Sequence, residues 1–104
     1  MQKTELLARA KSQLQRAFGG RLSGVLLYGS EARGDARQDS DIDLLVLLAG
    51  PVEHWRDSRI CVEALYDLVL EIERPIHAKP VDVRDFEAGK VPLYQRALRE
   101  GVLA

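Results

Sequence analysis

The stretch from Val25 to Leu48 constrains the fold of this chain most, because two short apolar runs enclose a polar segment. The runs are Val25–Tyr28 and Ile42–Leu48, and both are rich in Leu and Val and bounded by Gly, Ser or Asp. Runs of this length and composition predict buried β-strands. Asp43 interrupts the second run, although an unpaired charge in a buried strand is unfavourable. A residue that breaks a local packing rule is often functional, so Asp43 is the first candidate site residue.

Asp41 and Asp43 are expected to point to the same side of the second strand, because side chains alternate between the two faces. Two carboxylates about 5 Å apart repel each other by roughly 3 kcal/mol at an effective dielectric constant of about 20. A divalent cation between the two carboxylates would remove this repulsion. Because Mg²⁺ prefers carboxylate and phosphate oxygens, the pair predicts a Mg²⁺ site that a bound nucleotide completes.

The polar segment before the aspartates carries residue types that bind phosphate. Gly29 lets the backbone approach a ligand closely, and Ser30 adds a hydroxyl at the start of a short predicted helix. Arg33 lies on the same side of that turn as Ser30, where it can pair with a phosphate or, without a ligand, with one of the two aspartates. Gly34 is predicted to end the turn. The loop carries three further charged residues that are expected to be solvated: Asp35, Arg37 and Asp39. For Arg37, contact with a phosphate is the alternative.

Gly29-Ser30, ten intervening residues and Asp41-x-Asp43 resemble the G-S-x10-D-x-D pattern of the DNA polymerase β superfamily of nucleotidyltransferases. Ser40 and the Ala-Arg-Gly sequence that follows Glu31 also match this pattern. The short chain is most similar to the minimal nucleotidyltransferases, or MNT proteins, many of which are antitoxins paired with a HEPN-domain toxin. The strong resemblance covers about a quarter of the chain.

The resemblance implies an α/β (α+β) fold, with a small mixed β-sheet and helices packed against it in a single domain over residues 1–104. The implied reaction is transfer of a nucleoside monophosphate from a nucleoside triphosphate, ATP in the first instance, with Mg²⁺ as cofactor. Asp41 and Asp43 are implied as catalytic residues and metal ligands. The residues implied in nucleotide and phosphate binding are Gly29, Ser30, Arg33, Gly34 and Ser40.

Many members of this family carry a third catalytic carboxylate on a further strand, which helps to bind the metal and can act as general base. The corresponding strand is predicted over 76–83, with Pro80 at an edge position or a bulge. Depending on the register, the third position is His77, Lys79 or Asp82. A slip of one residue reverses the face to which each side chain points. Asp82 is the only carboxylate on that strand, so it is retained as a candidate catalytic residue.

The resemblance favours transfer of AMP to a hydroxyl group of a HEPN toxin partner, since a chain this short has no second domain to bind an acceptor. A different class of function is an inactive or weak MNT antitoxin that neutralises its toxin by complex formation. The uncertain third carboxylate favours this alternative, whereas the intact Gly-Ser and Asp-x-Asp motifs disfavour it. A third alternative is a stand-alone transferase that modifies a small molecule or an RNA end.

The rest of the chain shows helical and strand patterns on both sides of this stretch. Gly or Pro separates the segments in which apolar residues recur at regular spacing. The predicted elements are a helix over 2–18, a strand over 22–28, a helix over 53–73 and a helix over 92–100, besides the strands already described. Thr4 is a candidate cap of the first helix, and Asp57 or Ser58 of the second. Trp55 is expected in the core or at its rim rather than on a nucleotide base, and Cys61 as a small buried hydrophobe.

Composition limits the classes of partner. Fifteen Lys and Arg residues against sixteen Asp and Glu residues give a net charge of −1, so direct nucleic-acid binding is not expected. No apolar run approaches the roughly 20 residues of a membrane-spanning helix, and the polar N-terminus does not resemble a signal peptide. A cytoplasmic location without a membrane partner is therefore expected. The single cysteine excludes an internal disulfide and a cysteine-based zinc cluster, and apolar helix faces leave a homo-oligomer open.

Overall fold

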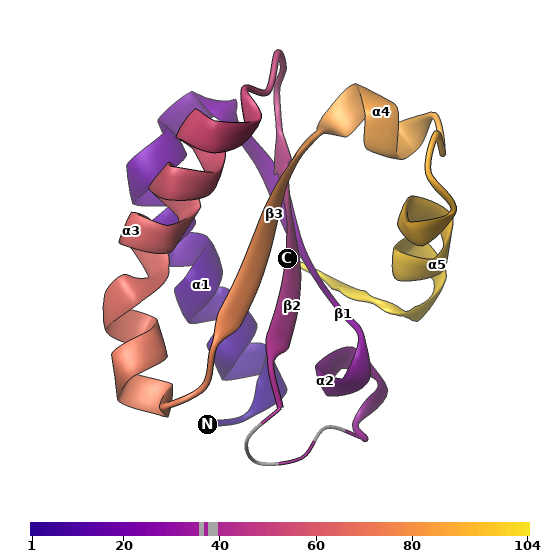
Figure 1. Ribbon diagram of the computed structural model, residues 1–104. Helices are drawn as coiled ribbons and strands as arrows, with labels where there is room; N and C mark the ends of the chain where they lie inside the picture. The colour runs from indigo at the N-terminus through magenta and orange to yellow at the C-terminus, as the bar shows by residue number, and fades with distance from the viewer. Residues whose placement is uncertain (36, 38–39) are drawn as a thin grey trace.

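The structure is a computed structural model that describes residues 1–35, 37 and 40–104, which form a four-stranded sheet with helices on both faces (Figure 1). The elements in chain order are α1 (Lys3–Phe18), a 3₁₀ turn (Gly19–Arg21), β1 (Leu22–Tyr28), α2 (Ser30–Arg33), β2 (Ile42–Leu48), α3 (His54–Ile72), β3 (Ile76–Asp82), α4 (Val83–Glu87), α5 (Pro92–Glu100) and β4 (Val102–Leu103). None of the described helices combines the length and the apolar composition that crossing a membrane requires.

The sheet is mixed. β1 pairs antiparallel with β2 and β4, whereas β2 pairs parallel with β3, so the strand order is β3-β2-β1-β4. α3 makes the long crossover that a parallel pair of strands requires. α1 and α3 cover one face of the sheet, and α4 and α5 lie on the other (Figure 1). This architecture confirms the predicted α+β class of a small mixed sheet with packed helices.

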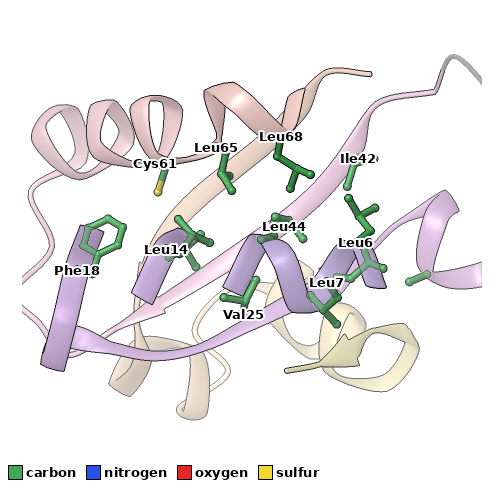
Figure 2. Close-up of a cluster of buried hydrophobic side chains, with 14 of the residues drawn as sticks. Leu6, Leu7, Leu14, Phe18, Val25, Ile42, Leu44, Cys61, Leu65 and Leu68 are labelled. Carbon is green, nitrogen blue, oxygen red and sulfur yellow. The ribbon is translucent and has the colours of Figure 1, made fainter. Parts of the chain in front are cut away.

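Side-chain alternation along β1 and β2 divides the apolar residues between two clusters. The cluster beneath α1 and α3, drawn in Figure 2, includes Leu6, Leu7, Leu14, Val25, Leu44, Cys61, Leu65 and Leu68. The cluster beneath α4 and α5 consists of Leu26, Leu45, Leu47, Val81, Phe86, Tyr94 and Ala97. Because both faces of β2 are covered, this strand is a continuous apolar run rather than an alternating one. Asp43 is its one polar residue.

The helix caps differ from those expected. Glu53 caps α3 by accepting hydrogen bonds from two backbone N–H groups of the first turn. Asp57 and Ser58 lie inside the helix, and Asp57 is fully buried, so neither is the cap. Thr4 also lies inside its helix and does not cap α1. The prediction for Trp55 is wrong as well, because 79% of this residue is exposed and it is not part of the core.

Two short elements near the end of the chain are not predicted by the sequence pattern. α4 forms directly after β3, where the Asp82 side chain accepts a hydrogen bond from the backbone N–H of Arg84. β4 has two residues and pairs with the middle of β1. Elements this short are not stable alone. They are stabilised by tertiary contacts, since Phe86 of α4 is buried in the core and β4 pairs with the edge of β1.

Candidate active site

Gly29 lies where the Gly-Ser turn meets the Asp-x-Asp strand of the candidate site. It follows β1 directly, and its φ of 76° is a backbone conformation that favours glycine. A Cβ atom at this position would lie 2.6 Å from Oδ2 of Asp43, well inside van der Waals contact. The glycine is therefore required both by the turn and by the close approach of the Asp43 carboxylate.

Asp43 lies on the face of the sheet that α4 and α5 cover. It is the cross-strand partner of Tyr28 and shares a face with Leu45. Partial burial raises the pKa of Asp43, and the charge of Asp41 raises it further, whereas His77 and Arg33 lower it. Burial and the Asp43 charge raise the pKa of Tyr28. The two aspartates, the histidine and the arginine thus lie within electrostatic reach of one another.

The short helix α2 carries the predicted phosphate-binding residues. Ser30 is its first residue, and Gly34 ends it with a left-handed φ of 82°, as expected. The Arg33 guanidinium pairs with Asp35 at 3.4 Å and with Glu100 of α5 at 3.7 Å. It does not pair with either aspartate of the Asp-x-Asp motif in the described residues. Because 47% of the Arg33 side chain is exposed, its guanidinium is accessible to a phosphate.

A mostly buried ion pair ties α2 and the loop end to α3. Arg74 donates two hydrogen bonds to the Glu31 carboxylate, the shorter at 2.9 Å, and a third to the backbone carbonyl of Ser40 at 2.9 Å. The Ser40 hydroxyl accepts a hydrogen bond from the backbone N–H of Arg37 at 2.8 Å. Sequence reasoning missed this role of Glu31 and Arg74, which has no motif of its own. Asp39 lies outside the described residues.

The register of β3 decides which residue lies at the third position. Asp43 is the parallel partner of His77, and Leu48 is the partner of Asp82. Asp82 therefore lies at the far end of β3, where it caps α4 and pairs with Arg84 at 3.3 Å. The structure corrects the expectation that Asp82 supplies the third carboxylate, because the register of β3 pairs Asp82 with Leu48 and not with Asp43.

His77 is the residue that this register places beside the two aspartates. Its Nε2 atom lies 3.3 Å from Oδ2 of Asp41, and it points to the same face as Asp43. Lys79 also points to that face, but its ammonium lies 5.6 Å from the centre of the Tyr94 ring. Of the three alternatives on this strand, only His77 contacts the Asp-x-Asp motif.

A small hollow of about 140 Å³ adjoins the Gly-Ser turn between β1, α2 and α5. Its lining includes Tyr28 and Gly29, together with the cationic residues Arg33 and Arg96. Arg96 was not a candidate from the sequence, since it lies in the tail of the chain. Only the packing of α5 against β1 brings this second arginine to the turn.

The donor chemistry at the aspartates fits Mg²⁺, because two carboxylates beside an open glycine turn can be completed by substrate phosphates. Gly29 supports this reading, since it lets a ligand approach Asp43 without a side chain in between. In the part of the chain that the structure describes, no three His, Cys, Asp or Glu side chains are already arranged to hold a metal ion together. The arrangement is that of a nucleotidyltransferase.

Comparison with known proteins agrees with this class. The family model described as polymerase beta, nucleotidyltransferase, matches residues 12–104. The Methanocaldococcus jannaschii protein MJ0141, provisionally named a protein adenylyltransferase, is 35% identical over 73 residues, which are 69% of this chain and 74% of that protein. A solved structure described as a toxin–antitoxin with AMP-PNP has a TM-score of 0.64 and 20% sequence identity, covering 90% of this chain and 68% of that chain. At this identity the likeness shows a shared fold.

The chain belongs to the polymerase β nucleotidyltransferase family. The family match includes the Gly-Ser turn, the Asp-x-Asp strand and the whole segment that carries β3 and α5. The resemblance expected from the sequence is thereby confirmed, and the chain is a nucleotidyltransferase by family.

Proposed function

We propose that this chain transfers AMP from ATP to a hydroxyl group in a Mg²⁺-dependent reaction. The observation that carries the proposal is the close approach of the Asp43 carboxylate to the Gly29 backbone. A Cβ atom added at Gly29 would lie only 2.6 Å from Oδ2 of Asp43. This close approach supports the proposal, because a phosphate bound at the Gly29 backbone would lie beside a metal ion held by Asp43. The name of the Methanocaldococcus jannaschii relative supports AMP as the transferred group.

Each residue of the site has a distinct role in this proposal. The Gly29 backbone and the Ser30 hydroxyl bind the terminal phosphates of ATP, and Arg33 turns from its exposed carboxylate partners toward them. Asp41 and Asp43 hold Mg²⁺, which supplies charge neutralisation and orientation at the transferred phosphate. Gly34 ends α2, and the Ser40 hydroxyl accepts a hydrogen bond from the backbone N–H of Arg37 in the loop.

The transfer is an in-line displacement at the α-phosphorus. The acceptor oxygen forms the new bond to this phosphorus, and the bond from phosphorus to the α–β bridging oxygen breaks. Pyrophosphate leaves with that electron pair, and the hydroxyl proton passes to solvent. The residues of the chain contribute positioning and electrostatic stabilisation rather than a covalent intermediate.

The acceptor in this proposal is a hydroxyl group of a protein partner, and a HEPN-domain toxin is the partner that the MNT resemblance implies. Two observations support a protein acceptor in such a pair. The Methanocaldococcus jannaschii relative is named as an enzyme that acts on protein, and the structural neighbour is a toxin–antitoxin with a bound ATP analogue. The net charge of −1 lends no support to an RNA end as the acceptor.

A second candidate function is an antitoxin with little or no transferase activity that acts by complex formation. The observation in its favour is His77, which occupies the position where the family resemblance implies a third carboxylate. Without a carboxylate there, activation of the acceptor hydroxyl is expected to be weaker.

Incubation with Mg²⁺ and ATP, with and without the candidate HEPN protein, tests the proposal by intact mass. We expect the HEPN protein to gain one or more AMP units. Asp43→Asn is expected to lower the rate by about two orders of magnitude or more, as for the loss of a transition-state contact. Asp67→Asn is the matched control, because Asp67 is an exposed aspartate of α3, which covers the face of the sheet opposite to that of Asp43 (Figure 1).

Two results would decide against transfer. An unmodified partner that nevertheless forms a stable complex would favour the second candidate function. Equal modification by wild type and Asp43→Asn would show that the site is assigned to the wrong residues.

A further inference from the structure

Helix α3 presents a row of large apolar side chains to solvent. The helix buries its opposite face in the core, through residues such as Cys61, Leu65 and Leu68. The apolar row consists of four residues that are between 58% and 79% exposed: Trp55, Val62, Tyr66 and Leu70. Their spacing of three to four residues, or twice that, places them on one side of the helix. Exposed apolar side chains that gather in this way mark an interaction surface, whereas scattered ones do not.

A groove of about 220 Å³ lies beside the apolar row, between α3 and the edge strand β3. Val62 and Tyr66 belong both to the row and to the lining of the groove, and Val69, Pro75 and Ile76 continue the lining toward β3. The side chains of the lining are almost all apolar. The surface therefore combines a ridge with a depression into which a side chain of a partner can pack.

The charged residues on the outward side of α3 are divided by sign along the helix. Arg56 and Arg59 come first, and the acidic residues Glu63, Asp67 and Glu71 follow at intervals of one turn. Two parallel copies of this face would bring like charges together. Two antiparallel copies bring the arginines of each copy opposite the acidic half of the other. The face is therefore complementary to itself about a twofold axis, as the contact between two identical chains requires.

We propose that the apolar row of α3 is the docking surface for a second copy of this chain, which binds in the antiparallel direction to form a twofold dimer. With the axis midway between Val62 and Tyr66, each of these two residues lies opposite the other residue of the second copy. Arg59, which pairs with Glu63 of its own helix at 3.7 Å, then also lies within reach of Asp67 of the second copy. This inference does not rest on the proposed function.

The dimer leaves both candidate active sites accessible. The Asp43 carboxylate lies on the face of the sheet that α4 and α5 cover, whereas α3 lies on the other face (Figure 1). The same axis places Trp55 opposite the end of the second copy that carries Leu70, beside the groove. Trp55 is 79% exposed in the single chain, so the dimer gives this side chain an apolar environment that the single chain does not.

Sedimentation of the purified chain over a range of concentrations tests for the dimer. We expect a reversible transition from monomer to dimer as the concentration rises. Trp55 is the single tryptophan of the chain, so its fluorescence reports on this surface alone. Its emission should move to shorter wavelength as the dimer forms, and both measurements should give the same dissociation constant.

Tyr66→Glu puts a charge at the centre of the apolar row and is expected to weaken the dimer by about tenfold or more. Leu98→Glu is the matched control, because Leu98 is 61% exposed on α5, which lies on the other face of the sheet (Figure 1). The same charge at that position should leave the dissociation constant unchanged. Circular dichroism of both variants checks that the fold is retained.

Charge reversal tests the antiparallel direction. Arg59→Glu and Asp67→Arg should each weaken the dimer, because each places like charges across the axis. The double variant restores opposite charges and should recover most of the lost affinity, which is the non-additive result expected of residues in contact. Losses that simply add would contradict the antiparallel arrangement.

Three outcomes would overturn the inference. The chain stays monomeric over the whole concentration range, or Tyr66→Glu dimerises as well as wild type does. In the third, the Trp55 emission moves only when the candidate HEPN protein is added, in which case the apolar row binds a different protein and not a second copy.

Discussion

Gly29 shows how much of this site depends on the absence of a single side chain. Its positive φ starts α2 in the required direction, and its missing Cβ leaves space for the Asp43 carboxylate. A methyl group at this position would collide with the Asp43 carboxylate unless the turn opened. The chemistry of the site therefore begins with a backbone conformation rather than with a charged group.

Gly29→Ala is expected to weaken nucleotide binding and to lower the free energy of unfolding by more than about 1 kcal/mol, because alanine is strained at positive φ. Thermal unfolding with and without Mg²⁺ and AMP-PNP measures both effects. Gly20→Ala is the control, because a Cβ atom at Gly20 meets no atom within 4 Å. Wild-type nucleotide binding by the Gly29 variant would contradict the role of the close approach.

At the scale of elements, α2 is too short to hold its own position and depends on neighbouring helices. Arg74, just after α3, binds both the Glu31 side chain of α2 and the Ser40 carbonyl at the end of the loop. The Lys3 ammonium of α1 donates a further hydrogen bond to the carbonyl of Ala32 at 3.0 Å. The Gly-Ser turn is thus positioned from the far side of the sheet, by contacts with α1 and with the residue that follows α3.

Arg74→Met is expected to destabilise the fold by about 1–3 kcal/mol, since it leaves a mostly buried carboxylate without its partner. Nucleotide affinity should fall as well, because α2 loses its link to α3. Urea unfolding and calorimetry with AMP-PNP measure the two effects. Arg59→Met breaks an exposed ion pair with Glu63 on the same helix and is expected to change stability by less than about 1 kcal/mol. Equal effects of the two substitutions would contradict this account.

At the scale of the whole molecule, one ion pair with a buried carboxylate joins three distant segments. Arg21, just before β1, donates two hydrogen bonds to the fully buried Asp57 of α3, at 3.0 and 3.1 Å, and one to the carbonyl of Pro51. Asp57 also accepts a hydrogen bond from the backbone N–H of Glu53. The pair fastens the start of β1 to the connection between β2 and α3, at the end of the sheet opposite the site.

The hydrogen bonds from Arg21 are the main reason why the pKa of Asp57 is lowered from 3.8 to about 2. A carboxyl group with a lowered pKa stabilises the fold above its unfolded-state pKa, and this stabilisation is lost as the pH falls through the folded-state value. The contribution of Asp57 is therefore complete at neutral pH and disappears between about pH 4 and pH 2.

Arg21→Met is expected to lower the free energy of unfolding by about 3 kcal/mol at pH 7, because the buried Asp57 carboxylate loses its main partner and keeps only the longer ionic contacts with Arg56. The difference from wild type should shrink as the pH falls below 4, where Asp57 becomes protonated in the variant. Urea unfolding between pH 2.5 and pH 7 measures this dependence. A difference that stays constant over this range would show that Asp57 is not the group responsible.

The local sequence determined the three longer strands and the Gly-Ser turn. These features follow from periodicities of two to four residues, which a short segment carries by itself. The apolar run of β2 also indicated a buried strand, and its single carboxylate remains the predicted site residue. Helices over most of 2–18, 53–73 and 92–100 followed from the same kind of pattern, although the cap of α3 did not.

Tertiary structure alone decided what surrounds Asp43. The pairing of Asp43 with His77 joins strands that are separated by all of α3, and no local pattern specifies a register across such a distance. The same holds for Arg74 with Glu31 and for Arg21 with Asp57, whose members come from different elements. Asp82 was the candidate for the third carboxylate because it is the only acidic residue of that strand. The pairing of β3 with β2 instead places His77 beside Asp43.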